Sequence, residues 1–353
     1  MARMKTDNYE TITAKFVDAL QAVVDGTSKR LPWQRDWRTL GAMRNGIKGN
    51  AYKGMNVWLL AMEGYTDPRW ATRNQIMTKC GYPKGKGKFG SWTDKDGEKG
   101  PKGIFPEYDK TDRATLPTTV TFWKFIPAPV KDKDGNVVKD DDGNPLVRRI
   151  PLLKLFRVYN FEQITGPEGK EPKPLTDDTL DVDPDEVHAE AERVFSAYLE
   201  AQGLTVTYKG DKAYYNITDD TVTLPEAKAF RTAEGFQRTK AHELVHSTGA
   251  KGRLNRNLRN FFGSADYARE EVVAELGAAF LCSDLGVSNE GDLDDNHTAY
   301  LMSWIKRLQD NKYEIFTAGK LARQAVAMVK GEAADASTDT TEGKATSTES
   351  RAA

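Results

Sequence analysis

The sequence predicts an α+β fold in two domains, and three observations lead to this prediction. The first half of the chain contains segments rich in β-branched and aromatic residues, which are typical of strands. An acidic stretch over residues 166–185 has the Pro and Gly content of a linker. Helical patterns dominate residues 235–330. We therefore expect an N-terminal α+β domain over residues 1–165 and a mostly helical C-terminal domain with a small sheet over residues 186–330.

Length and composition set the broad class of the protein. The chain has 353 residues, of which 39% are hydrophobic, enough to bury a core in each domain. It has neither a signal-peptide pattern nor the roughly 20 consecutive apolar residues of a membrane span, so we expect a cytoplasmic protein without a membrane partner. Cys80 and Cys282 lie far apart and outside any CxxC pattern, so we interpret both as ordinary thiols.

The N-terminal elements follow from local patterns. Residues 9–24 carry apolar side chains at helical spacing, which predicts an amphipathic helix. TTVTFWKFI, residues 118–126, has the composition of a strand, and residues 152–161 are its expected partner. The charged segment between them, residues 131–145, contains two DGN turns and predicts an exposed hairpin or loop.

The C-terminal elements begin after the linker. A helix is expected over residues 184–202, followed by short strands at residues 204–208 and 221–225. The second of these, TVTLP, is a candidate for an edge strand that holds an extended peptide through backbone hydrogen bonds. Residues 331–353 contain no large apolar side chain, so we expect this tail to be disordered.

The distribution of charge is uneven along the chain. Residues 26–113 contain 18 Lys and Arg against 9 Asp and Glu, whereas residues 164–200 contain 3 against 11. A basic front end in a chain of net charge −1 indicates an anionic partner, for which nucleic acid is the usual case.

The sequence HELVH, residues 242–246, is the strongest chemical motif. On a helix, His242 and His246 lie one turn apart, so both imidazoles can reach one metal ion, and the spacing suits zinc. Glu243 lies to the side, where it can act as a general base on a zinc-bound water. The alternative is a helix that carries two surface histidines, which is the less common origin of this pattern.

A catalytic zinc site needs a third protein ligand and an open fourth position. Glu271 and Glu275 in AREEVVAELGAAF share a helix face, whereas Glu270 is expected to point elsewhere. EVVAE is similar to the ExxxD segment of gluzincin metallopeptidases, with Glu271 at the ligand position and Glu275 in place of the usual Asp. This resemblance implies that Glu271 binds the metal and that Glu275 hydrogen-bonds to a ligand histidine. Glu275 is the second choice for the ligand.

Further candidate residues follow the metal motif. In DNHTAYLMSW, His297 and Tyr300 lie on a predicted helix, and either can stabilise an oxyanion, with a capping or core role as the alternative.

Aromatic residues among Lys and Arg at the front end are what single-stranded nucleic acid binding requires. Some of these rings must belong to the core, and Trp58 within VWLLAM is the one expected to be buried. The candidate DNA-binding residues are Trp33, Arg35, Trp37, Asn45, Tyr52, Lys53, Asn56, Trp70, Arg73, Lys84, Lys86, Lys88 and Trp92.

The motifs together resemble a known family. PWQRDW, NAYKGMNVWLL, GYTDPRWATRNQ, FRVYNFEQ, TLP, HELVHSTGAKGRLNR, YAREEVVAELGAAFL and HTAYLMSW occur in the order found in the ArdC-like antirestriction proteins of plasmids and phages. The resemblance covers about residues 8 to 330, and related modules occur in plasmid primases of the TraC type. Residues 131–145 look longer than the family pattern, and the acidic tail is not part of it.

The resemblance implies an N-terminal domain that binds single-stranded DNA and a C-terminal zincin-like metallopeptidase domain with one Zn²⁺ ion, or Mn²⁺ as an alternative. It also implies that the protein protects incoming DNA from host restriction. Two functions stay open. In the first, DNA recruits a metalloprotease that cleaves a DNA-associated protein such as a restriction component. In the second, the protein is a non-enzymatic shield on single-stranded DNA, and zinc only stabilises the fold.

Overall fold

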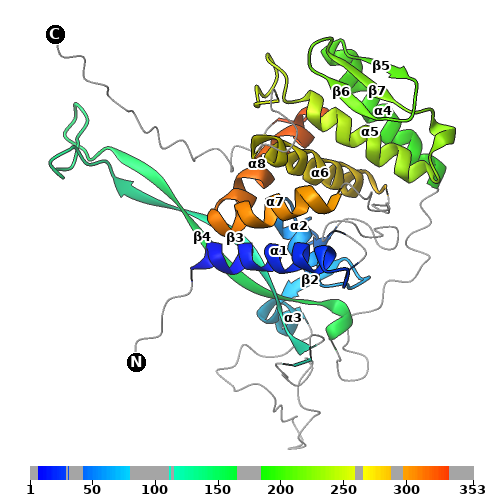
Figure 1. The fold of residues 1–353 in the computed structure, drawn as a ribbon. Helices are drawn as coiled ribbons and strands as arrows, with labels where there is room; N and C mark the ends of the chain where they lie inside the picture. Colours follow the sequence, from blue (N-terminus) through cyan, green and yellow to red (C-terminus); the bar gives the residue numbers. More distant parts are fainter. Residues whose placement is uncertain are drawn as a thin grey trace, which may run out of the picture.

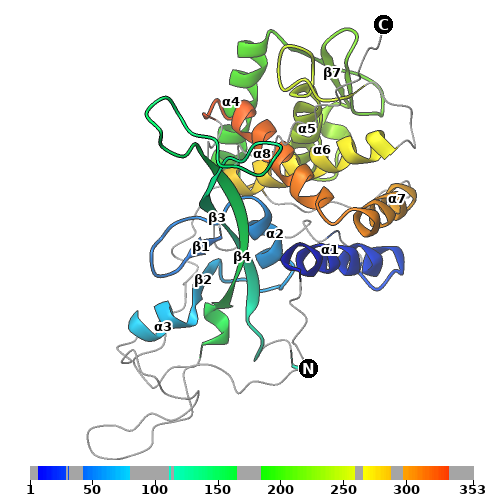
Figure 2. The ribbon, with the colours of Figure 1, turned by 90° about the vertical axis from the view of Figure 1, so that its left-hand side faces the viewer.

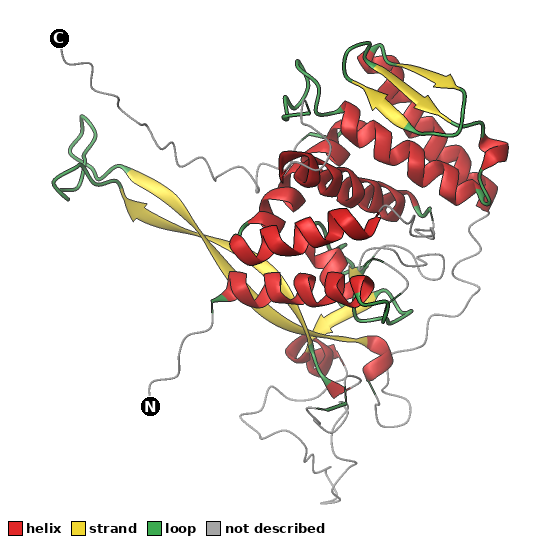
Figure 3. Ribbon diagram, in the orientation of Figure 1, coloured by secondary structure: helices red, strands yellow, loops and turns green. Residues whose placement is uncertain are grey.

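The computed structural model describes residues 7–28, 31, 43–79, 111–112, 115–164, 184–258, 265–287 and 297–333 (Figure 1). Within these ranges the chain forms an α+β fold with two sheets, and helices make up most of the second half, as predicted (Figure 3). No helix among the described residues is both long and apolar enough to cross a membrane.

The first helix forms where the apolar spacing predicts it. Helix α1 spans Asn8–Val24, and the side chain of Asp7 caps its first turn by accepting a hydrogen bond from the backbone N–H of Tyr9. Ile12, Phe16 and Leu20 follow one another at intervals of four residues, so they share one face of the helix, and that face is buried.

The N-terminal sheet has the strand order β1-β2-β4-β3. Its strands are β1 (Arg44–Asn45), β2 (Arg69–Thr72), β3 (Thr118–Pro129) and β4 (Val147–Asn160), with α2 (Met55–Ala61), α3 (Arg73–Lys79) and the short helix η2 (Phe161–Gln163) beside them. Strands β3 and β4 pair antiparallel from Thr118↔Val158 to Pro129↔Val147, which confirms the predicted pairing and extends it.

The distal part of this hairpin projects from the body of the molecule (Figures 1 and 2). Residues 131–145 connect the two strands and are mostly exposed, as predicted. Each DGN turn is closed by the aspartate that begins its loop, since Asp132 and Asp140 accept hydrogen bonds from backbone N–H groups two and four residues later.

The second sheet is small and has the order β5-β7-β6. Its strands are β5 (Thr205–Tyr208), β6 (Tyr214–Asn216) and β7 (Thr221–Leu224). The prediction that TVTLP forms an edge strand was wrong, because β5 pairs with one side of β7 and β6 with the other. Strand β6 has only three residues, too few to show an alternating pattern in the sequence.

Five helices and one short helical turn complete the described residues of the C-terminal half. They are α4 (Pro184–Gln202), η4 (Ala227–Ala229), α5 (Ala233–Ser247), α6 (Ala265–Leu285), α7 (His297–Asp310) and α8 (Glu314–Val329). Helix α6 packs against α5 on one side and α8 on another, so it occupies the centre of this half.

One hydrophobic core joins parts of both halves of the chain, and two smaller buried clusters belong to the N-terminal half. Apolar side chains of α1 and α2 belong to the same buried cluster as those of α4 to α8. Trp58 of α2 stacks on Phe280 of α6 with the ring centroids 4.4 Å apart and the planes at 7°, and Phe16 meets the edge of Trp58. The N-terminal and C-terminal halves are therefore packed together.

Candidate metal centre

Helices α5 and α6 pack against each other, and a glycine allows their close approach. A Cβ atom at Gly277 would lie 2.7 Å from the side chain of Val245, which is closer than van der Waals contact permits. Without a side chain at this position, α6 can pack directly on α5. Carboxylates of α6 can then reach the histidines of α5.

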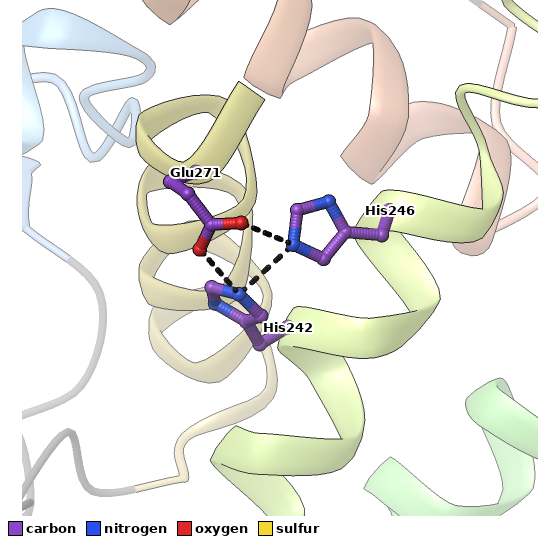
Figure 4. A group of neighbouring side chains, drawn as sticks. All are labelled: His242, His246 and Glu271. Carbon is purple, nitrogen blue, oxygen red and sulfur yellow. Dashed lines mark hydrogen bonds and ion pairs between the residues drawn. The ribbon is translucent and has the colours of Figure 1, made fainter. Parts of the chain in front are cut away.

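The two histidines of HELVH point into the space between these helices. Their Nε2 atoms are 3.1 Å apart, and the carboxylate of Glu271 on α6 faces both of them (Figure 4). Glu271 Oε2 lies 3.6 Å from His242 Nε2, and Glu271 Oε1 lies 3.6 Å from His246 Nε2. The structure therefore brings the three predicted ligand side chains together.

These distances suit a tetrahedral metal ion. Ligand atoms about 2.0–2.2 Å from an ion are separated from one another by roughly 3.3–3.6 Å in tetrahedral geometry. All three atoms lie within 4.8 Å of one another, which is the spacing of a metal-binding group. The side chains of His242, His246 and Glu271 are 17%, 14% and 22% exposed, so solvent reaches the group.

A second carboxylate contacts the outer nitrogen of each histidine. Glu275 Oε1 lies 3.6 Å from His242 Nδ1, so it lies beside a ligand histidine, as predicted. Glu270 Oε1 lies 3.2 Å from His246 Nδ1, so the prediction that Glu270 points elsewhere was wrong. An imidazole has nitrogens on opposite edges, and adjacent residues of α6 can therefore contact different histidine edges.

An arginine holds each of these outer carboxylates. Arg238 donates a hydrogen bond to Glu275 over 2.5 Å, and Arg256 donates two to Glu270, over 2.8 and 2.9 Å. Arg256 also donates to the backbone carbonyl of Val245, which fixes it against the end of α5. Two chains of arginine, glutamate and histidine thus orient the imidazoles.

The charges of the site favour a divalent cation. Four carboxylates, those of Glu243, Glu270, Glu271 and Glu275, surround the histidines, and two arginines offset only half of that charge. Burial opposes protonation of His242, but the hydrogen bond to Glu271 and the nearby carboxylates raise its pKa to about 9. Burial also works against the charged form of Glu271, yet the two histidines lower the pKa of Glu271 to about 2.

Glu243 and Tyr267 border the same space. Glu243 is 6% exposed and accepts no hydrogen bond from any residue that the structure describes, so its carboxylate is available as a base. Tyr267 lies one turn before Glu271 on α6 and donates a hydrogen bond to it; burial, followed by the charge of Glu271, raises the pKa of this tyrosine. Our sequence reasoning missed Tyr267, although a residue four positions before a ligand on one helix is a foreseeable neighbour.

His297 and Tyr300 occupy the first turn of α7. Their side chains lie outside the described part of the structure, so the oxyanion role stays a prediction. Trp304, one turn later, donates a hydrogen bond to the backbone carbonyl of Ala268 and ties α7 to the helix that carries Glu271.

The candidate DNA-binding residues fall into two groups. Asn45, Tyr52, Lys53, Asn56, Trp70 and Arg73 are described. Trp33, Arg35, Trp37, Lys84, Lys86, Lys88 and Trp92 lie outside the described residues.

Trp70 was predicted wrongly as a DNA-stacking residue. It lies on β2 and is fully buried, and Tyr65 packs against it edge to face, so no base can reach it. Trp58 is buried as predicted. The error arose because the residue type does not show whether a tryptophan is buried in a strand or exposed in a loop. Only tertiary packing decides this.

Asn45 and Asn56 have structural roles. The Asn56 amide exchanges hydrogen bonds with the backbone N–H and C=O of Thr121, which ties α2 to β3. Asn45 closes a turn by accepting from the N–H groups of Ile47 and Lys48. These bonds occupy the groups that were expected to contact DNA.

Tyr52, Lys53 and Arg73 keep some accessible surface. Lys53 is exposed, whereas Tyr52 is partly buried against the core and burial raises the pKa of its hydroxyl. Arg73 is partly buried at the start of α3, and this burial lowers the pKa of its guanidinium.

Two family models match the chain. One describes the N-terminal domain of the anti-restriction factor ArdC and matches residues 6–159. The other describes a zincin-like metallopeptidase and matches residues 190–321, a range that includes the whole candidate metal centre.

Curated relatives are similar over most of the chain. The uncharacterized protein y4eC of Sinorhizobium fredii is 30% identical over 344 residues, which cover 96% of this chain and 97% of that protein. Two DNA primases TraC of Escherichia coli are 32% and 31% identical over 88% and 90% of this chain. The chain spans only 19% and 26% of the length of those primases.

Two solved structures have the same fold. Both are of the antirestriction ArdC protein from the R388 plasmid, and each match covers 92% of this chain. The metal-free structure has a TM-score of 0.58 at 28% identity, and the Mn(II)-bound structure has a TM-score of 0.56 at 25% identity.

Proposed function

The chain belongs to the ArdC-like antirestriction family, and on that basis we propose that it protects incoming DNA from restriction by binding single-stranded DNA and by carrying a metal-dependent peptidase. The N-terminal region, about residues 1–165, would bind the DNA, and about residues 186–330 would hold the peptidase, with residues 166–185 as a linker and 331–353 as a tail. Its protein substrate would be a DNA-associated protein such as a component of the restriction system.

One observation carries the peptidase part of this proposal. His242, His246 and Glu271 converge from two helices, and the buried carboxylate of Glu243 lies beside them without a hydrogen bond from a described residue. Three protein ligands with an open fourth position are typical of catalytic zinc sites rather than structural ones.

The donor set favours zinc as the resident ion. Two imidazoles and a carboxylate are common zinc ligands, and the same set also accepts manganese where that ion is more available. The Mn(II)-bound ArdC structure of R388 makes manganese the first alternative. When bound, such an ion acts as a Lewis acid and lowers the pKa of the water that it binds.

Several residues of the chain have separate roles in the proposed peptide hydrolysis. Glu243 accepts a proton from the water that attacks the peptide carbonyl and passes it to the departing amine. Glu270 and Glu275 keep the two imidazoles oriented, and Tyr267 does the same for Glu271. We also propose His297 or Tyr300 as the group that stabilises the developing oxyanion.

The experiment compares the wild-type chain with Glu243→Gln. The substrate is a DNA-binding protein loaded on a single-stranded oligonucleotide, with Zn²⁺ or Mn²⁺ present. We expect cleavage to fall about 100-fold or more, because the amide cannot take the proton, while metal content and DNA affinity stay unchanged. Glu200→Gln, at an exposed position on α4, is the matched control.

Two outcomes would contradict the enzymatic proposal. Equal cleavage by the wild type and Glu243→Gln would show that this carboxylate is not the base. No cleavage by either protein, with intact DNA binding and protection, would favour the non-enzymatic shield.

A further inference from the structure

The distal part of the β3–β4 hairpin exposes large apolar side chains away from the body of the protein. We call residues 122–129 and 147–156 the arm; Figures 1 and 2 show that the described helices leave its outer part uncovered. Phe122 and Phe156 are 54% and 43% exposed, and their ring centroids lie 5.8 Å apart. Contiguous exposed apolar surface of this kind marks an interaction site more often than chance.

The pairing register assigns the side chains of the arm to two faces. Phe122↔Lys154, Lys124↔Leu152 and Ile126↔Ile150 are directly opposite pairs, and alternate residues of a strand point to the same side. The even-numbered side chains therefore share one face, which we call the arm face. Its apolar members are Phe122, Ile126, Ile150, Leu152 and Phe156, and its cations are Lys124, Arg148 and Lys154.

The opposite face of the arm packs against the body at its inner end, while Pro127 and Val147 farther out on that face are exposed. Trp123 contacts Tyr9 of α1 and Phe316 of α8, and Leu153 is buried. The body thus holds the arm through one face and leaves the arm face toward solvent, so the exposed rings are not needed to anchor the hairpin.

The arm is cationic without compensating acids. Residues 122–129 and 147–156 contain four Lys and Arg and no Asp or Glu. Lys124, Arg148 and Lys154 form no ion pair with any residue in the described part of the chain. The sign reverses at the tip, since residues 131–145 contain three Lys and five Asp. A phosphate backbone would be attracted along the strands and repelled at the tip.

We propose that the arm face binds single-stranded DNA, with bases stacked on Phe122 and Phe156 and phosphates held by Lys124, Arg148 and Lys154. This inference rests on the DNA binding in the proposed function and assigns that binding to the arm face. Rings alternating with cations are the arrangement that single strands require, because unpaired bases expose faces for stacking while the phosphates need positive charge. A second copy of the chain is a poorer occupant, because pairing two arm faces would bring like charges together.

The test measures binding of a fluorescent single-stranded 20-nucleotide DNA to the full chain by anisotropy at several salt concentrations. For Phe122→Ala with Phe156→Ala, we expect affinity to fall about tenfold or more, with an unchanged salt slope. For Lys124→Gln, Arg148→Gln and Lys154→Gln combined, we expect the slope of log affinity against log salt to become shallower by about 2, roughly 0.7 for each lost phosphate contact.

Two single variants serve as controls. Val137→Ala removes an exposed apolar side chain at the tip, and Tyr214→Ala removes an exposed ring on β6; both should bind DNA as the wild type does. Circular dichroism and the thermal midpoint verify that every variant is folded.

The possible results separate this proposal from the one it rests on. If the wild type binds DNA and the arm variants bind equally well, the arm proposal is overturned and the DNA-binding function stands. If the wild type does not bind DNA, both fail. A third result, from size-exclusion chromatography, would be that the wild type and the controls are dimers and the arm variants are monomers. If the arm variants then bind DNA as tightly as the wild type does, the arm proposal is overturned, and the arm face is a contact between two copies of the chain.

Discussion

The candidate metal centre between α5 and α6 and the arm of β3 and β4 are both rich in charged side chains. The charges near the metal centre are paired, whereas those on the arm form no ion pair with any described residue. Near the metal centre the buried Lys240 contacts Glu192 at 2.6 Å, and Arg256 contacts Glu270 at 2.8 Å. On the arm, Lys124 and Lys154 have no ion pair with a described residue.

The difference follows from solvation. A buried charge without a partner costs several kcal/mol, so charges inside the body must be paired for the chain to fold. An exposed cation is solvated by water, and leaving it unpaired costs almost nothing. Charges of the body therefore stabilise the fold and balance a cation, whereas the charges and rings of the arm are available to a ligand.

The largest expected effect contrasts an aromatic ring in the body with one on the arm. Trp58→Ala removes the ring that is stacked on Phe280 in the shared core, so we expect the free energy of unfolding to fall by about 3–5 kcal/mol. Phe122→Ala on the arm should change it by less than about 1 kcal/mol. Urea denaturation measures the free energy of unfolding of both variants. Similar losses in the two would contradict the expected difference between the body and the arm.

The next effect concerns the carboxylate behind a ligand histidine. Glu270→Gln leaves the three proposed metal ligands in place but weakens the contacts with His246 and Arg256, so we expect metal affinity to fall about 10- to 100-fold. Competition with a chelator measures this change. Asp266→Asn, at an exposed position one turn earlier on α6, is the control. Unchanged affinity in Glu270→Gln would mean that His246 is oriented by other contacts.

The smallest effect is a pH dependence. Burial opposes the charge of Glu314, but Arg269 and Arg307 outweigh it and lower the pKa of Glu314 below its ordinary value of 4.5. Its stabilisation is therefore present above pH 4.5 and is lost as the pH falls through the lowered folded-state pKa. Glu314→Gln should cost about 1–2 kcal/mol at neutral pH.

Thermal midpoints measured from neutral to acid pH test this expectation. The gap between the wild type and Glu314→Gln should narrow as the pH falls, while Glu200→Gln, exposed on α4, should match the wild type throughout. A gap that widens in acid would contradict the assigned sign.

Local patterns predicted much of the fold. The expected helix over residues 9–24 is α1, and the two long strands pair as expected. The sequence did not predict that β6 covers one side of β7, because strand pairing depends on partners distant in the chain. It also placed Trp70 on the surface, since residue type alone does not fix burial.

The candidate site divides in the same way. The sequence by itself determined that His242 and His246 lie one turn apart on a helix with Glu243 beside them, because the geometry of an α-helix fixes every short spacing. Only the tertiary structure decided which carboxylates meet them, since Glu270, Glu271 and Glu275 come from another helix. Their reach depends on the close packing of α6 on α5 at Gly277, a contact between distant segments that no local pattern encodes.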